Sequence, residues 1–311
     1  MMASFLRLQF SYLLRTLPHR HNWRYKLWTV VDAARLVLGY LRLKVTLRFS
    51  TRAAAIGGKT CVVVLLSHNR PQNMSLIVHG ALRNQFVTRV IVSNSNPQVK
   101  LTDWIKCTDS RLTLVDEAIA TQPGHRLVLA SDTGAEYVLS IDDDIFLTPK
   151  QWRRFFEFLI HNEQVPHGIV GQIYRPGTTS SNGSPFHHVI AEDTPVDVLI
   201  GAFAFTREHL NRVFRLAADV GISDVSQVRN GEDILLSFSG TSRPQIHAMR
   251  PALFCASEGL PGIALWRTDQ QFWDERIRMF EKVRRALNAM KTSWMTKGNE
   301  RTLDGRQLAN T

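Results

Sequence analysis

The sequence predicts an α/β fold in which a doubly wound, mostly parallel sheet is flanked by helices. Three observations predict it. The run 61–66 is apolar at every position, as in a strand buried on both faces. Strand-like runs then alternate with helix-like segments along the chain. The fourth such run ends in Asp142-Asp143-Asp144, and open parallel sheets bind ligands at the carboxyl ends of their strands.

The first predicted strand, 61–66, is followed by a loop and then Pro71, a residue favoured in the first turn of a helix. We expect that helix to reach about residue 84. The other expected strands cover 89–93, 112–115, 136–141, 168–173 and 196–205. The other expected helices cover 124–131, 149–161, a segment starting near 206, 230–238 and 268–289. Residues 175–188 are rich in Gly, Ser, Thr and Pro and are expected to form a loop.

Most of the net charge of +11 lies in the first 60 residues, which hold 11 Lys and Arg against the single Asp32 (11 − 1 = +10). The remainder is close to neutral, so no nucleic-acid partner is expected. Charges at the centre of the most apolar window, 27–45, cost about 2.5–3.5 kcal/mol each on insertion, which argues against a membrane span. We interpret the segment as a basic amphipathic helix that either contacts an anionic membrane surface through residues 1–52 or packs on its own domain.

Trp28, Val31, Leu38 and Leu41 recur at helical spacing on the expected apolar face of this segment. Residues 53–58 are expected to form a linker. The chain is therefore divided into a basic helical segment, 1–58, an α/β domain, 59–292, and a disordered tail, 293–311. Three widely spaced cysteines fit a reducing compartment. With no span visible, we expect a cytoplasmic protein, peripheral on the membrane, rather than one of the Golgi lumen.

The three aspartates are the strongest candidate site. Apolar residues flank them on both sides, and no Lys or Arg lies within four residues to offset their repulsion. A hard divalent cation, Mn²⁺ or Mg²⁺, would offset it, because such ions prefer carboxylate oxygen. If the chain stays extended, Asp142 and Asp144 point the same way and hold the metal, while Asp143 engages another ligand group. The alternative is a solvated acidic turn.

Other candidate residues follow the predicted strands or begin predicted helices. Glu232 and Asp233 either cap a helix or face the reaction centre. Arg276 lies on the last long helix, where it either forms part of a solvated charged face or binds a diphosphate. His187 and His188 are interpreted as loop histidines. The residues expected to bind a phosphate-containing ligand at this edge of the sheet are Ser67, Asn69, Arg70, Asn94, Arg126, Asp142, Asp143, Gly201 and Ala202.

Taken in order, these strings resemble a GT-A-fold glycosyltransferase of the exostosin-like type, glycosyltransferase family 64. The similar strings are 66–70, 92–94, Ile141-Asp142-Asp143-Asp144, 198–203, Asn230-Gly231-Glu232-Asp233-Ile234 and 262–265. The sequence departs from the family pattern at His68, Gly231 and Phe272, where Tyr, Cys and His are usual. Family 2 glycosyltransferases also carry a Gly-Glu-Asp string, so either type is open.

The resemblance implies a metal-dependent enzyme that moves a hexosyl or N-acetylhexosaminyl group from a nucleotide sugar. The donor is expected to be UDP-linked, the acceptor a glycan or other hydroxyl compound, and the reaction retaining. Asp142 and Asp144 would hold Mn²⁺ or Mg²⁺, and Glu232, Asp233 and Arg276 would be catalytic. The alternatives are a Mg²⁺-dependent nucleotidyltransferase or phosphotransferase and a non-enzymatic basic protein that binds membranes or nucleic acid.

Overall fold

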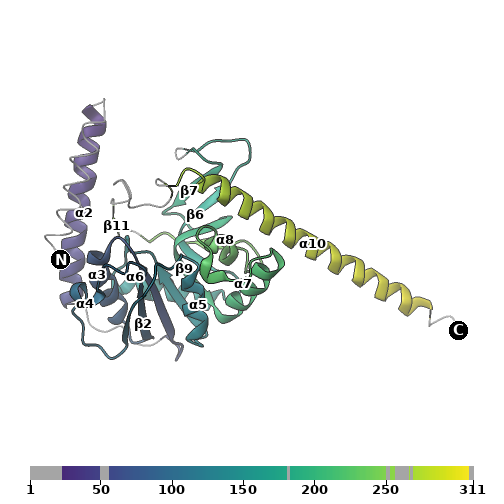
Figure 1. Ribbon diagram of the computed structural model, residues 1–311, viewed down its shortest axis with the longest axis horizontal. Helices are drawn as coiled ribbons and strands as arrows, with labels where there is room; N and C mark the ends of the chain where they lie inside the picture. The colour runs from purple at the N-terminus through teal and green to yellow at the C-terminus, as the bar shows by residue number, and fades with distance from the viewer. Residues whose placement is uncertain are drawn as a thin grey trace.

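The computed structural model describes residues 23–49, 56–180, 183–249, 253–255, 266 and 269–307. Residues 53–55 of the expected linker and the string 262–265 lie outside these residues. The predicted doubly wound, mostly parallel sheet is confirmed (Figure 1). The strands are β1 Cys61–Ser67, β2 Val87–Asn94, β3 Leu112–Asp116, β4 Tyr137–Ile141, β5 Ile145–Phe146, β6 His167–Tyr174, β7 Phe186–Ile190, β8 Thr194–Pro195, β9 Val198–Thr206, β10 Gln245–Ile246 and β11 Leu253–Phe254.

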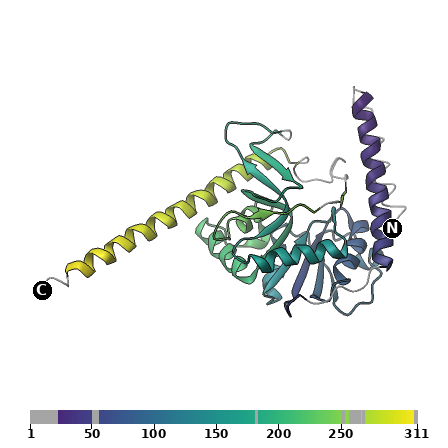
Figure 2. The same ribbon diagram turned by 180° about the vertical axis from the view of Figure 1, so that it is seen from behind.

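Helices and one 3-10 turn connect these strands. They are α2 Trp23–Phe49, α3 Pro71–Leu82, α4 Leu101–Trp104, α5 His125–Asp132, α6 Pro149–His161, α7 Arg207–Asp219, η2 Val225–Gln227, α8 Glu232–Ser237 and α10 Phe272–Gln307. The backbone of α10 continues through 293–307, where the sequence had predicted a disordered tail. It extends well beyond the rest of the domain, on the side away from α2 (Figures 1 and 2).

The main sheet has the order β3-β2-β1-β4-β9-β6-β10-β8, with β7 paired to the end of β6. β3, β2, β1 and β4 are mutually parallel, so their carboxyl ends lie at one edge. β9 runs antiparallel between β4 and β6, an insertion that the pattern of alternating strands and helices did not predict. The prediction of a loop over 175–188 is wrong for residues 186–188. Phe186 is buried and begins strand β7, which contains His187 and His188.

The sheet separates two hydrophobic cores, which explains why the first strand is apolar at every position. Val63 and Leu65 belong to the core beneath α3 and α6. Val62 and Val64 belong to the core beneath α5, α7 and α8. Side chains of successive strand residues point to opposite faces, so each face of β1 is covered by helices. This arrangement holds the carboxyl ends of the central strands at one fixed edge.

A histidine at the start of α7 makes the fold sensitive to acid. The Thr206 hydroxyl accepts from the His209 amide, and the Thr206 amide donates to His209 Nδ1 at 3.1 Å. That acceptor role requires an unprotonated Nδ1. Burial, aided by the positive charge of Arg212, lowers the pKa of His209 to about 4. As pH falls, this histidine is protonated near pH 6.5 in the unfolded chain but only near pH 4 in the folded chain. The folded state therefore loses stability as pH falls from about 6.5 to about 4.

We predict that His209→Gln reduces the loss of unfolding free energy between pH 7 and pH 5 by about 2 kcal/mol. Glutamine is a normal residue at this position of a capping box and does not titrate, so the cap is kept. Urea unfolding at the two pH values measures the effect. The control is His161→Gln, which changes an exposed histidine at the end of α6. Equal pH dependence in His209→Gln and the unaltered chain would contradict the assignment.

Candidate functional site

The three aspartates lie in a tight turn at the carboxyl end of β4. The Asp142 amide donates to the Gly201 carbonyl at 2.7 Å, and the Ile145 amide donates to the Asp142 carbonyl at 3.2 Å. Gly201 has a φ of +71°, and an added Cβ there would lie 2.9 Å from Ile145 Cδ1. Glycine therefore suits both the backbone conformation and the close approach at this position. The extended geometry assumed for Asp142 and Asp144 is not formed, because the chain turns after Asp142.

Asp143 and Asp144 are held from the α3 side of the sheet. Arg70, the residue before α3, forms an ion pair with Asp143, and its second nitrogen lies 3.2 Å from Asp144 Oδ2. Asn73, in the first turn of α3, donates to the Asp143 carbonyl at 2.8 Å. Arg70 is 73 residues from Asp143 in sequence, so a local search for basic residues could not find it. The turn between β4 and β5 is thus fastened to the start of α3.

Asp142 is held from the opposite side of the sheet. Arg126, the second residue of α5, donates to Asp142 Oδ1 at 2.7 Å and to Ser140 Oγ at 3.4 Å. Its Nε lies 4.0 Å from Glu232 Oε1. Ser140 and Asp142 are two residues apart on β4, so both side chains face α5. One guanidinium therefore brings the acidic turn together with the acidic start of α8.

Asp233 forms the third ion pair of the site, with Arg276 on α10. The pairing is bidentate, with distances of 3.0 and 2.8 Å. Arg276 also donates twice to Gln172 Oε1, at 3.2 and 3.0 Å, and Gln172 Nε2 lies 2.9 Å from His188 Nε2. Arg276 is only 3% exposed, so it is not part of a solvated face. Burial and the charge of Arg276 lower the pKa of His188.

We call these eight residues the acidic edge: Arg70, Arg126, Asp142, Asp143, Asp144, Glu232, Asp233 and Arg276. Five carboxylates face three guanidinium groups, which leaves a formal charge of −2 when every carboxylate is ionised. Burial, together with repulsion from Asp233 and Asp142, raises the pKa of Glu232 to about 7. The edge therefore carries more negative charge than its arginines offset, and one carboxylate retains a proton up to neutral pH.

The side chains of Asp142 and Asp144 are the accessible members of the turn. They are 38% and 23% exposed, against 10% for Asp143, which Arg70 and Asn73 cover. These two carboxylates therefore fit a hard cation reached from solvent. Among the residues that the structure describes, no group of three His, Cys, Asp or Glu could hold a metal alone. A cation here would need ligand oxygens from a bound phosphate as well.

Of the other predicted donor residues, Ser67 and Asn94 lie at the same edge, where β1 and β2 end, and Ala202 does not. Asn94 is committed to the fold, donating to the carbonyls of Asn96 and Val99 and to Asp116. Ser67, paired with Asn94 across β1 and β2, has a buried hydroxyl without a hydrogen-bond partner in the described chain. Ala202 is fully buried in the core rather than at the edge, because the residue after Gly201 points to the other face of β9.

Sequence reasoning missed Gln172, Ser140 and Asn73, which orient the charged groups. Each lies inside a predicted strand or helix, and an isolated polar side chain there gave no signal.

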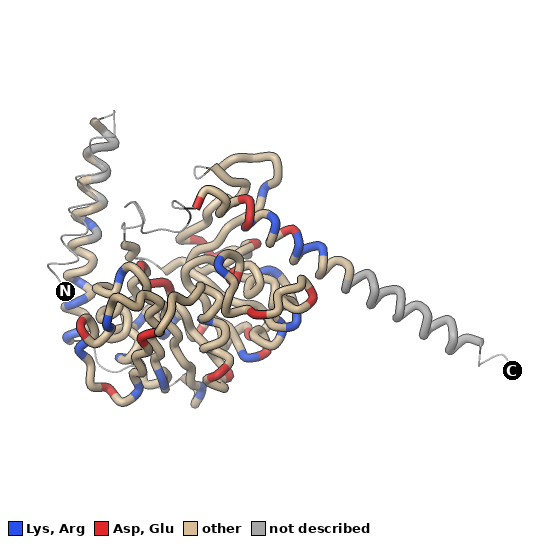
Figure 3. The backbone as a smooth tube through the Cα atoms, viewed as in Figure 1, with Lys and Arg blue, Asp and Glu red and all other residues tan. Residues whose placement is uncertain are grey.

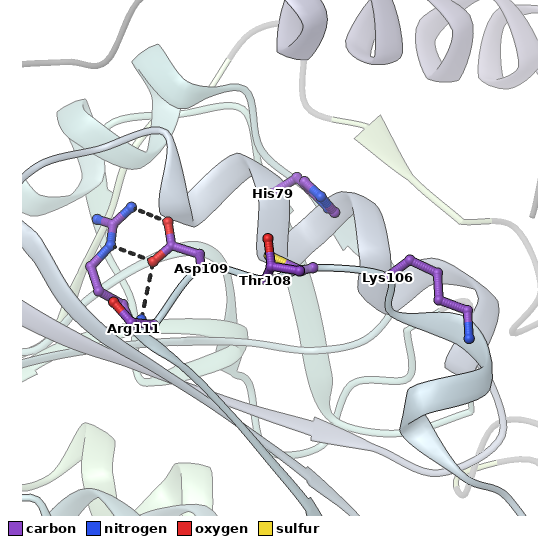
Figure 4. A pocket seen from close by; sticks show the side chains of 7 residues that line it. His79, Lys106, Thr108, Asp109 and Arg111 are labelled. Atoms are coloured by element: carbon purple, nitrogen blue, oxygen red, sulfur yellow. Dashed lines mark hydrogen bonds and ion pairs between the residues drawn. The ribbon is translucent and has the colours of Figure 1, made fainter.

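A separate hollow lined by His79, Lys106, Thr108, Asp109 and Arg111 is not part of the acidic edge (Figure 4). These residues precede β3 or lie on α3, and Arg111 donates to the carbonyls of Leu82, Asn84 and Val87. The hollow is thus at the amino ends of the strands, the opposite edge.

We predict that Arg276→Met lowers the free energy of unfolding by about 3–5 kcal/mol, because it leaves Asp233 buried without its cation. Adding Asp233→Leu should recover most of that loss without recovering activity. Denaturant unfolding and an activity assay on the single and double variants test this. The matched control is Arg278→Met, an exposed arginine two residues along the same helix. A loss of stability in Arg278→Met equal to that in Arg276→Met would contradict the pairing.

We predict that Glu232→Gln flattens the pH dependence of stability above pH 5. The raised pKa means that the unfolded chain loses its Glu232 proton near pH 4.5 and the folded chain near pH 7. Stability therefore falls as pH rises through that window, by about 2 kcal/mol between pH 5 and pH 8. Urea unfolding at both values should show this loss in the unaltered chain and not in Glu232→Gln. The exposed Glu136→Gln serves as control, and an unchanged profile in Glu232→Gln would refute the assignment.

Comparison with known proteins gives a family. The model of the Glycosyl transferase family 64 domain matches residues 60–296. Searching the curated proteins finds no match. Among solved structures, the crystal structure of GalNAc-T7 with UDP, GalNAc and Mn²⁺ is similar at 12% identity and a TM-score of 0.43, over 61% of this chain and 42% of that one.

This chain thus covers less than half the length of GalNAc-T7, and at that similarity the ligands describe GalNAc-T7 alone. The family match rests on firmer ground, because it spans most of the chain and contains every residue of the acidic edge. It includes the acidic turn of β4, the start of α8 and Arg276. The predicted family is confirmed: the chain belongs to the glycosyl transferase family 64 domain family.

Proposed function

We propose that the enzyme transfers a sugar from a nucleoside-diphosphate sugar, UDP-linked as the family resemblance implies, to a hydroxyl group of a glycan or similar acceptor. One observation carries the proposal: Arg126 contacts Asp142 at 2.7 Å and approaches Glu232 at 4.0 Å. The turn that would bind the diphosphate and the helix that would face the sugar therefore share one edge of the sheet. This edge is also where open parallel sheets bind nucleotides.

The charge of the acidic edge supports a divalent cation as part of donor binding. A diphosphate brings further negative charge to a site whose three arginines already contact carboxylates. Asp142 and Asp144, the two accessible carboxylates of the turn, would hold Mn²⁺ or Mg²⁺, which supplies Lewis-acid stabilisation of the leaving diphosphate when bound. Arg70 and Arg126 would orient these carboxylates from opposite faces of the sheet.

The pairing of Asp233 favours a role in charge stabilisation. Both of its oxygens accept from Arg276, and Oδ1 also accepts from the Ile234 amide at 2.8 Å. A carboxylate held in this way keeps its negative charge in a fixed position. It would stabilise the positive charge that develops on the anomeric carbon, rather than take the proton of the acceptor. This supports a retaining reaction, in which that proton passes to the leaving phosphate oxygen as the acceptor oxygen bonds to the anomeric carbon.

Glu232 is the group placed to hold a proton near the working pH. Its pKa of about 7 lies where general acid–base catalysis is most effective. Should the reaction be inverting, Glu232 rather than Asp233 would receive the proton of the acceptor. The profile of kcat/KM against pH separates a retaining from an inverting reaction. Only in an inverting reaction would the Glu232→Gln variant lose the rise in kcat/KM near pH 7.

We predict that Asp144→Asn and Asp142→Asn each lower kcat/KM for nucleotide-sugar turnover by 100-fold or more, and weaken the dependence of rate on Mn²⁺. Asp233→Asn should lower kcat to a similar degree while the Mn²⁺ dependence stays unchanged. The measurement is release of nucleoside diphosphate over a range of Mn²⁺ and Mg²⁺ concentrations. Asp132→Asn, an exposed change at the end of α5, is the control.

Product analysis in the same assay tests the class of reaction. Sugar transfer releases a nucleoside diphosphate, whereas a nucleotidyltransferase would release pyrophosphate. Wild-type rates in either Asp144→Asn or Asp233→Asn would remove the role assigned to that residue.

A further inference from the structure

Helix α2 carries a long exposed apolar stripe that the catalytic domain does not cover. Eight apolar residues in the described helix are exposed, and several are large: Trp23 is 67%, Leu38 65% and Phe49 76% exposed. Isolated exposed apolar residues are common on protein surfaces, but a contiguous row marks an interaction surface. We call this row the α2 stripe; it consists of Trp23, Leu27, Val30, Ala34, Leu38, Leu41, Val45 and Phe49.

The spacing of the α2 stripe suits a straight helix on a flat surface. Successive members are three or four residues apart. The spacing pattern repeats every 11 residues, from Trp23 to Ala34 and from Ala34 to Val45. At 3.6 residues per turn, an 11-residue repeat drifts by only about 20° per repeat, so the stripe stays within an arc of about 100° along the helix. The 27 residues of α2 extend about 40 Å at 1.5 Å per residue. A continuous apolar strip of this length faces away from the domain.

The other side of α2 is fixed to the domain. Tyr40, Leu43 and Leu47 are buried in the core beneath α3. The Tyr40 ring meets Phe146 of β5 edge to face, with centroids 6.1 Å apart. An added Cβ on Gly39 would lie 2.8 Å from Leu253 of β11, so the helix backbone approaches that strand closely. α2 therefore has two apolar faces, and folding of this domain covers only one of them.

Basic residues border the exposed face. The sequence of α2 contains six Lys and Arg and the single acidic residue Asp32, a net charge of +5 (6 − 1). Arg35 and Arg42 are exposed and lie beside the α2 stripe on the helical wheel, and Arg48 is exposed within it. Figure 3 shows basic residues on the described part of α2. A polar border rich in Arg around Trp, Leu and Phe is the pattern of a helix that lies in a membrane interface.

We infer that the α2 stripe docks the enzyme on the surface of an anionic lipid bilayer. Anionic headgroups complement the arginines, and the apolar residues would enter the boundary between headgroups and acyl chains. Among the described residues, no helix is long and apolar enough to cross a membrane. A second copy of α2 is a poorer occupant, because it would place two rows of arginines together and leave their charge unmatched.

Docking through α2 would carry the acidic edge to the bilayer. Phe146, which contacts Tyr40, is two residues after Asp144 and belongs to the strand that closes the acidic turn. β11 extends the link, since the Cys255 amide next to it donates to the Asp144 carbonyl at 2.7 Å. The helix and the turn are therefore joined by packed side chains and a backbone hydrogen bond, so docking through α2 would hold the site near the membrane surface.

The test is co-sedimentation of the full chain with phosphatidylcholine vesicles, with or without phosphatidylglycerol, at low and high salt. We expect binding to the anionic vesicles that weakens with salt. Leu27→Gln/Leu38→Gln/Leu41→Gln and Arg35→Gln/Arg42→Gln/Arg48→Gln should each lower the partition coefficient on the order of tenfold or more. All six side chains are exposed, so the fold should be kept, and circular dichroism checks this.

Matched controls carry the same chemical changes on the catalytic domain. Ile119→Gln/Ile190→Gln alters exposed isoleucines, and Lys100→Gln/Lys150→Gln/Arg215→Gln removes three exposed positive charges. Both should bind vesicles as the unaltered chain does. Vesicle binding that is retained in the α2 variants, or lost equally in the controls, would overturn the proposal. So would a lipid-free dimer in sedimentation equilibrium that dissociates in the leucine variant while vesicle binding is unchanged.

Discussion

The organisation of the site depends on the placement of like charges at one edge of the sheet. Three consecutive aspartates end a buried strand, and two more acids begin α8 close by. Such a group is stable only if cations reach it, and the fold supplies three arginines from separate elements. Arg70 comes from the α3 side, Arg126 from the α5 side and Arg276 from α10. Each is largely buried, so its position is set by the core and not by a flexible side chain at the surface. The remaining negative charge is what makes the edge suited to a divalent cation and a diphosphate together.

The arginines on the two faces of the sheet also give Asp142 and Asp143 different roles. Even-numbered residues of β4 face α5 and odd-numbered residues face α3. In the turn that follows β4, Asp142 contacts Arg126 and Asp143 contacts Arg70. Asp142 thereby lies toward Glu232 and the expected reaction centre, whereas Asp143 anchors the turn. Asp233 is set further along the same edge by Arg276, whose own orientation depends on Gln172. A change at Gln172 would therefore alter the position of Asp233 through Arg276.

The fold was largely predictable because it rests on local patterns. The apolar strand 61–66 and the helix 149–161, with its proline and apolar face, are found where the sequence places them. The acidic turn and Glu232-Asp233 were also found, since clustered acids beside apolar runs are a strong signal. The arginine contacts were not predictable in detail, because they join residues far apart in sequence, such as Arg70 and Asp143, 73 positions apart, and Arg276 and Gln172, 104 positions apart. The strand β9 was predicted, but its antiparallel direction and the whole of strand β7 were not, because strand pairing depends on partners far away in sequence. The sequence identified the exposed apolar face of α2 through Leu38 and Leu41, but not the second face that Tyr40 and Leu43 bury against the domain.

The central claim is that Asp142 and Asp144 hold a divalent cation together with the diphosphate of the donor. Crystals of the enzyme grown with UDP and Mn²⁺, measured at a wavelength where manganese scatters anomalously, test it most directly. We predict one strong anomalous peak about 2 Å from carboxylate oxygens of Asp142 and Asp144 and equally close to phosphate oxygens. Bound UDP with no anomalous peak at the turn, or a manganese peak remote from both aspartates, would contradict it.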